Sequence, residues 1–66
     1  MDQSIIGKIA GDIWNYLNEK GETDTFKIKL DLNLNNSLLF LALGWLLREN
    51  KISIREEKNN YLIKLI

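Results

Sequence analysis

A chain of 66 residues makes one small domain, spanning residues 1–66, and leaves no room for a second. It contains no cysteine and no histidine, which excludes disulfides, a Cys/His zinc site and imidazole chemistry. Nine Lys and Arg residues balance nine Asp and Glu residues, so the chain lacks the basic excess of most domains that bind through phosphate contacts.

The beginning of the chain, MDQSIIGKIAGDIW, lacks the basic region and the continuous apolar stretch of a signal peptide. The longest apolar run, residues 38–47 with a glycine inside it, is about half of the roughly 20 residues that span a bilayer. We therefore expect a soluble, cytoplasmic protein without a membrane partner.

The first predicted element is a helix that ends at Gly21, with Asp2 or Ser4 as the residue capping its start. Apolar residues recur there at spacings of three and four, which is the period of a helix with one buried face. They are Ile5, Ile6, Ile9, Ala10, Ile13 and Leu17, with Trp14 and Tyr16 widening the stripe.

The second element, TDTFKIKLDLNL over residues 23–34, alternates between apolar and polar residues. A period of two favours a half-buried strand. Wound as a helix, the same residues form two apolar sectors about 160° apart, which is a poor pattern for a helix buried on one side. The local pattern therefore favours a strand.

The third element is a helix that starts with Asn35 or Asn36 as its N-cap and runs to about Glu49. Its predicted core stripe consists of Leu39, Ala42, Leu43 and Leu46. Residues 51–66 predict a β-hairpin, because Ile52 and Ile54 alternate with polar residues, residues 58–60 supply a turn, and an apolar segment follows.

The segment LNLNNSLLFLALGWLLRENKI, residues 32–52, resembles the turn and recognition helix of winged helix-turn-helix domains without a gap. The whole chain resembles a small family of stand-alone winged-helix domains of unknown function in bacteria and archaea, through IGKIAGDIWNYLNEKGE and SLLFLALGWLLRENKI. The resemblance implies an α+β fold with three helices and a C-terminal β-hairpin wing.

The resemblance also implies that residues 25–32 form the short second helix, because Leu32 and Leu34 fall on the positions of the turn. A helix packed between two others can be apolar on two sides, which suits the two sectors. Leu30 departs from the family pattern, since such helices usually have a polar residue there. We therefore predict a helix, and a strand over residues 23–34 is the alternative.

The side of the third helix opposite its core stripe is unusual for a helix that reads DNA. Base edges and phosphates require donors and acceptors, whereas this side is mostly large and apolar. An apolar side chain left in water forgoes about 1.5–3 kcal/mol relative to burial. We therefore predict a protein interface, most simply of a homodimer, in which Gly44 lets a second backbone come close. The predicted interface residues are Leu38, Phe40, Leu41, Gly44, Trp45 and Arg48.

Three alternatives are open. In the first, the wing or the second helix covers Trp45 and Leu41, which are then core residues. In the second, the chain is an adaptor for a larger regulatory partner. In the third, it binds DNA as a transcriptional regulator. The candidate nucleic-acid residues are Lys27, Lys29, Asn36, Ser37, Arg55 and Lys58. Acidic residues are equally dense near them, and the asparagines are read first as helix caps.

No enzymatic site is predicted. Glu56 and Glu57 are adjacent on a predicted strand, so their side chains point to opposite faces and form no acid/base pair. The chain has no glycine-rich phosphate loop, no nucleophile with a base and no metal-ligand spacing, and no cofactor is expected.

Overall fold

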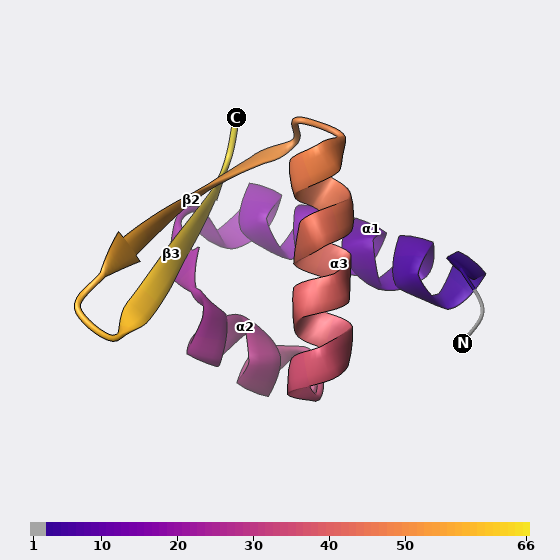
Figure 1. Cartoon of the computed structure of the whole chain (residues 1–66), viewed down its shortest axis with the longest axis horizontal. Coiled ribbons are helices and arrows are strands. Elements are labelled where there is room, and N and C mark those ends of the chain that lie inside the picture. The colour runs from indigo at the N-terminus through magenta and orange to yellow at the C-terminus, as the bar shows by residue number, and fades with distance from the viewer. Residues whose placement is uncertain (1–2) are drawn as a thin grey trace.

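The computed structural model describes residues 3–66 as three helices and a small antiparallel sheet (Figure 1). This is the α+β arrangement of a winged helix-turn-helix domain, as predicted. The elements are α1 Gln3–Lys20, β1 Thr23–Asp24, α2 Thr25–Asp31, α3 Asn36–Arg48, β2 Ile52–Glu57 and β3 Asn60–Leu65.

The predicted inner stripe of α1 is confirmed with one exception. The buried residues of this helix are Ile6, Ile9, Ala10, Ile13, Tyr16 and Leu17. Ile5, which was predicted to belong to the stripe, is about half exposed. It lies about 80° around the helix from Ile13, at the edge of the stripe, and in the first turn.

The end of α1 is where the sequence predicts it. Gly21 has a φ of 80°, the left-handed backbone that glycine adopts most easily, and its N–H donates to the carbonyl of Leu17 at 2.8 Å. At the other end, Ser4 lies inside the helix and so does not precede it. The other predicted cap, Asp2, lies outside the described residues.

The segment over residues 23–34 is a helix, and the strand alternative is wrong for most of it. Only Thr23 and Asp24 pair with β3, and α2 follows immediately. The carboxylate of Asp24 accepts the backbone N–H of Lys27 at 2.7 Å, so the residue that ends the strand also caps the helix. This hydrogen bond stabilises a helix start within an alternating sequence.

The two apolar sectors of α2 have different environments. Ile28 is fully buried, whereas Phe26 and Leu30 are 63% and 61% exposed. The expectation that α2 packs between two other helices is therefore wrong: one sector faces the core and the other faces solvent.

The predicted core stripe of α3 is confirmed. Leu39, Ala42, Leu43 and Leu46 are at most 4% exposed. Of the two predicted N-caps, Asn35 is the one used, because its side-chain oxygen accepts the backbone N–H of Leu38 at 2.8 Å. The helix ends at Arg48, followed by Glu49 as C-cap, close to the predicted end.

The predicted wing is present as an antiparallel pair of β2 and β3, with Lys58 and Asn59 in the turn. The short strand β1 is the part of residues 23–34 for which the strand alternative holds. It pairs with the other edge of β3, so the strand order is β1-β3-β2. Ile52 and Ile63 turn inward and are buried against the helices. Figure 1 shows the wing projecting to one side of α3, which lies across α1.

Candidate interaction surface

The outer face of α3, defined here as Phe40, Leu41, Gly44, Trp45, Leu47 and Arg48, is exposed along its length. Its four large apolar side chains remain 49%, 50%, 41% and 45% exposed in chain order. Leu41 and Trp45 are therefore not core residues of the monomer. Leu38, the remaining predicted interface residue, is half-buried and packs against the core.

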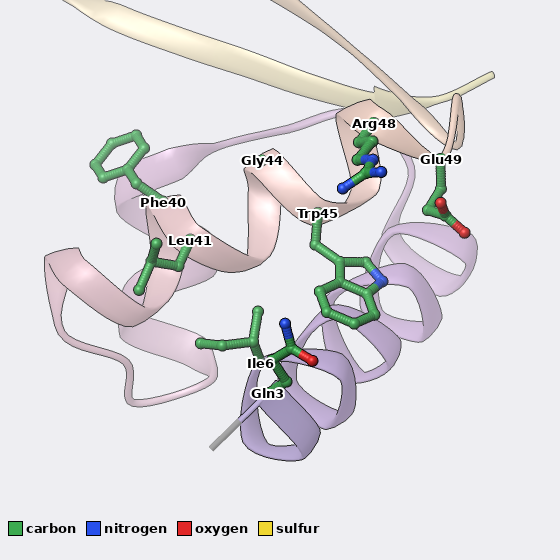
Figure 2. A pocket seen from close by; sticks show the side chains of 8 residues that line it. All are labelled: Gln3, Ile6, Phe40, Leu41, Gly44, Trp45, Arg48 and Glu49. Carbon is green, nitrogen blue, oxygen red and sulfur yellow. The ribbon is translucent and has the colours of Figure 1, made fainter. Parts of the chain in front are cut away.

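A groove of about 590 Å³ lies between the outer face of α3 and the first turns of α1. Figure 2 shows Trp45 extending from α3 toward α1, whereas Phe40 points away from α1. The groove is lined by Gln3, Ile6, Phe40, Leu41, Gly44, Trp45, Arg48 and Glu49. Five of the six predicted interface residues thus line one hollow in the surface.

The indole of Trp45 lies over a glycine of α1. A Cβ placed on Gly7 would lie 3.6 Å from Cζ2 of Trp45, in van der Waals contact. A methyl group at position 7 would therefore fit against the edge of the ring, and Trp45 as a whole stays 41% exposed. This contact was not predicted from the sequence, because nothing in either local pattern links residue 7 to residue 45.

The apolar surface continues from α3 onto the wing. A second hollow of about 420 Å³ is lined by Thr25, Phe40, Leu43, Ile54, Tyr61 and Ile63. Phe40 lines both hollows, so it stands between the α1 side and the wing side. Ile54 and Tyr61 are partly exposed and were not predicted as site residues. The alternation of Ile52 and Ile54 could have identified Ile54 as a site residue, because it places both side chains on the face of β2 that points toward the helices.

Arg48 is the one charged member of the outer face of α3, and it is exposed. Within residues 3–66, the ion pairs join Lys8 to Asp12, and Arg55 to Glu22 and to Glu57; none involves Arg48. Its position at the C-terminal end of α3 is favourable for a positive charge.

The candidate nucleic-acid residues are spread over three elements. Lys27 and Lys29 lie on α2, Asn36 and Ser37 in the first turn of α3, and Arg55 and Lys58 in the wing. All are exposed except Lys29, which is half-buried. The guanidinium of Arg55 lies 3.5 Å from Glu22 and 3.6 Å from Glu57, so its charge is already offset.

One partly buried hydrogen bond joins α1 to the end of α2. The hydroxyl of Tyr16 donates to the Asp31 carboxylate at 2.6 Å. Burial, together with this hydrogen bond and the nearby negative charge, raises the pKa of Tyr16 to about 12. The interaction positions α2, and we assign it a structural role.

The described part of the chain has neither a cluster of metal ligands nor a single helix that could span a membrane. Among residues 3–66, no three Asp or Glu side chains gather closely enough to hold a metal ion. No single helix in residues 3–66 is long and apolar enough to cross a membrane. Helices α2 and α3 together have the required length and hydropathy, but the two are bent by 115° relative to each other.

Comparison with known proteins identifies the family. Residues 1–65 match the family model described as a winged helix-turn-helix domain (DUF2582). The chain belongs to this family. The resemblance inferred from the recognition-type helix and the preceding turn is therefore confirmed over nearly the whole chain.

Relatives of this winged-helix domain occur in archaea and bacteria. The chain is 36% identical over 62 residues to the uncharacterized protein MJ1608 of Methanocaldococcus jannaschii, covering 91% of this chain and 89% of the relative. It is also similar to the solution NMR structure of protein BT2368 from Bacteroides thetaiotaomicron, with a TM-score of 0.85 and 35% identity. That match covers 98% of this chain and 79% of the other.

Proposed function

We propose that this winged-helix domain is a non-enzymatic interaction module that forms a homodimer through the outer face of α3. The observation that carries the proposal is the difference in solvent exposure between the two sides of α3. One side of the helix is almost completely buried, and the opposite side holds four large apolar residues that stay about half exposed. Exposed apolar residues that cluster beside a groove are typical of protein interfaces.

The chemistry of the surface favours a protein partner over a nucleic acid. Phosphate contacts need cationic side chains, and the outer face of α3 has one, Arg48. The chain as a whole has no net charge. In contrast, aromatic residues and arginine are the side chains that most often contribute strongly to protein interfaces, and Phe40, Trp45 and Arg48 lie together here.

The size of the domain and its charge both permit a second copy of the same chain as the partner. A stable interface buries about 800 Å² on each partner, which is about one sixth of the 4667 Å² surface of the domain. Two copies also meet without net repulsion, because each is neutral overall. Burial of the face would add to the small core available to 66 residues.

DNA binding is the second candidate function, and one observation favours it. In the helix-turn-helix arrangement the first turn of the recognition helix approaches the bases, and Asn36 and Ser37 are exposed at that position. Asn35, rather than Asn36, caps the helix, which leaves the Asn36 side chain available.

Sedimentation of the wild-type chain over a concentration series tests the homodimer. We expect a dimer at micromolar concentration; a chain that remains monomeric at about 100 μM would contradict the proposal. Binding to DNA is measured in parallel at about 50 mM salt, where phosphate contacts are strongest. Affinity that falls steeply with salt, and is lost when Arg55 and Lys58 are replaced, would favour the second candidate.

A further inference from the structure

Gly44 lies in the middle of the outer face of α3, and the monomer does not explain why a glycine is there. A Cβ placed on Gly44 would meet no atom within 4 Å, so no neighbouring group requires the space. The residue is helical, and Gly21 is the glycine with positive φ among the described residues, so the backbone does not require glycine either. Glycine weakens a helix interior relative to alanine. Glycine at position 44 therefore lowers the stability of α3, and no contact within one chain compensates for this loss.

We infer that α3 of one copy crosses α3 of a second copy at Gly44, in antiparallel orientation about a two-fold axis. This inference rests on the proposed homodimer and specifies its geometry. A two-fold axis brings the same residue of both copies together where it passes through the interface. A residue without a side chain at that point lets the two helix backbones approach closely, so that the flanking side chains interlock.

The side chains around Gly44 are arranged for such a crossing. At 100° per residue, Phe40 and Leu47 lie on the wing side of Gly44, and Leu41 and Arg48 lie on the α1 side. A two-fold axis perpendicular to both helices makes the second helix run in the opposite direction. The wing side of one copy then lies beside the wing side of the other, and the α1 side lies beside the α1 side. Phe40 therefore packs on Leu47 of the second copy, and Leu41 packs on the aliphatic stem of Arg48 of the second copy.

The pairing accounts for residues that the monomer leaves uncovered. Leu47 is as exposed as Phe40 and Leu41, and the crossing provides each of these three with an apolar partner. Leu47 is not among the interface residues predicted from the sequence. The antiparallel crossing makes Leu47 a central interface residue, which is a consequence of the geometry that can be tested.

The charge of Arg48 selects the antiparallel orientation. A parallel crossing would place the two Arg48 side chains next to each other, where like charges repel. In the antiparallel crossing they lie on opposite sides of the two-fold axis, about 12 Å apart along the helices. Each helix C-terminus then lies beside the N-terminal half of the other helix, so their dipoles attract.

A matched pair of substitutions tests the crossing point. Gly11 of α1 is also helical and exposed, and a Cβ there also meets no atom within 4 Å. It does not line the groove that Gly44 lines, although it lines a separate hollow together with Trp45. We expect Gly44→Leu to raise the dimer Kd about tenfold or more, while the melting temperature of the dilute monomer stays equal or rises. Gly11→Leu should leave the Kd unchanged. Sedimentation equilibrium and circular dichroism measure the two quantities.

Cysteine cross-linking tests the orientation, because the chain has no cysteine of its own. Disulfides form between Cα atoms about 4.4–6.8 Å apart. Under mild oxidation, Gly44→Cys should give a covalent dimer, and Arg48→Cys should not. A covalent dimer from Arg48→Cys alone would indicate a parallel crossing and overturn the inference.

The outcomes separate the inference from the proposal on which it rests. A wild-type dimer whose Kd does not change with Gly44→Leu would overturn the crossing at Gly44 and leave the homodimer in place. A wild-type chain that is monomeric throughout the concentration series would overturn both. Loss of the dimer in both glycine variants would show that α1 contributes to the interface, which also contradicts a crossing centred on Gly44.

Discussion

Helices α2 and α3 each expose more than one large apolar side chain, and the two sets differ in their surroundings. On α2, Phe26 and Leu30 are the more exposed pair, but neither lines any of the hollows described above. Lys27 and Lys29 alternate with them along the chain. On α3, the exposed residues are less accessible individually, yet Phe40, Leu41 and Trp45 line hollows toward α1, and Phe40 also lines the hollow toward the wing.

The comparison shows that accessibility alone does not identify a site. Isolated apolar side chains on a surface are common and require no explanation. The α3 face differs in three respects: its apolar residues are contiguous, a glycine interrupts them without a reason inside the monomer, and the surface is hollowed on both sides. These features support an interface on α3 and none on α2.

The largest expected effect concerns the two sides of α2. Ile28→Ala removes a fully buried side chain and should lower the free energy of unfolding by about 3 kcal/mol. Leu30→Ala, on the exposed side, should change it by less than about 0.5 kcal/mol. Urea unfolding at equal protein concentration measures both. A similar loss in the two variants would mean that the exposed side of α2 is covered in solution.

The next effect compares α2 with α3 directly. Phe40→Glu places a charge in the proposed interface and should raise the dimer Kd about 100-fold, which corresponds to about 2.7 kcal/mol. Phe26→Glu makes the same exchange on α2 and should leave the Kd unchanged. Sedimentation equilibrium provides the measurement, with circular dichroism to verify folding. If Phe26→Glu dissociates the dimer and Phe40→Glu does not, the interface has been placed on the wrong helix.

A smaller effect concerns the hydrogen bond that joins α1 to α2. Below pH 10 Tyr16 is neutral in both folded and unfolded chains. Between pH 10 and 12 it ionises in the unfolded chain first, because its folded pKa is raised to about 12. Stability should therefore fall as the pH rises through this window, by about 2 kcal/mol.

Urea unfolding at pH 9 to 12 measures this loss, and Tyr16→Phe should remove the part due to Tyr16. In a Tyr61→Phe background, the absorbance of tyrosinate reports Tyr16 alone. Ionisation of Tyr16 near pH 10 in the folded chain would show that the hydrogen bond to Asp31 does not form in solution.

The three helices differ in how far the sequence predicted them. For α1 and α3, apolar residues at helical spacing identified the buried sides, because each helix packs one continuous stripe against a single core. For α2 the spacing predicted a strand, and only the resemblance to a family corrected it. Seven residues are too few for a helical period to be distinguished from an alternating one. The hydrogen bond that the backbone N–H of Lys27 donates to the Asp24 carboxylate stabilises the helix locally.

The candidate site was also predicted only in part, because the sequence pattern reports single helices and strands and not the packing between them. The outer face of α3 follows from the geometry of one helix, so the exposure of Phe40, Leu41 and Trp45 could be expected. The contact of Trp45 with Gly7, and the extension onto Ile54 and Tyr61, depend on how distant segments pack. Neither a helical nor a strand period contains that information. The cytoplasmic location expected from the sequence stays a prediction.

The smallest effect separates two neighbouring asparagines at the start of α3. Asn35 accepts the N–H of Leu38, so Asn35→Ala should lower the free energy of unfolding by about 1 kcal/mol. Asn36 lies inside the helix with an exposed side chain, and Asn36→Ala should have little effect on stability. Urea unfolding of the two variants at equal concentration measures the difference. If Asn36→Ala instead weakens binding to DNA while stability is unchanged, the exposed first turn of α3 reads bases, and the homodimer would then have to leave that turn uncovered.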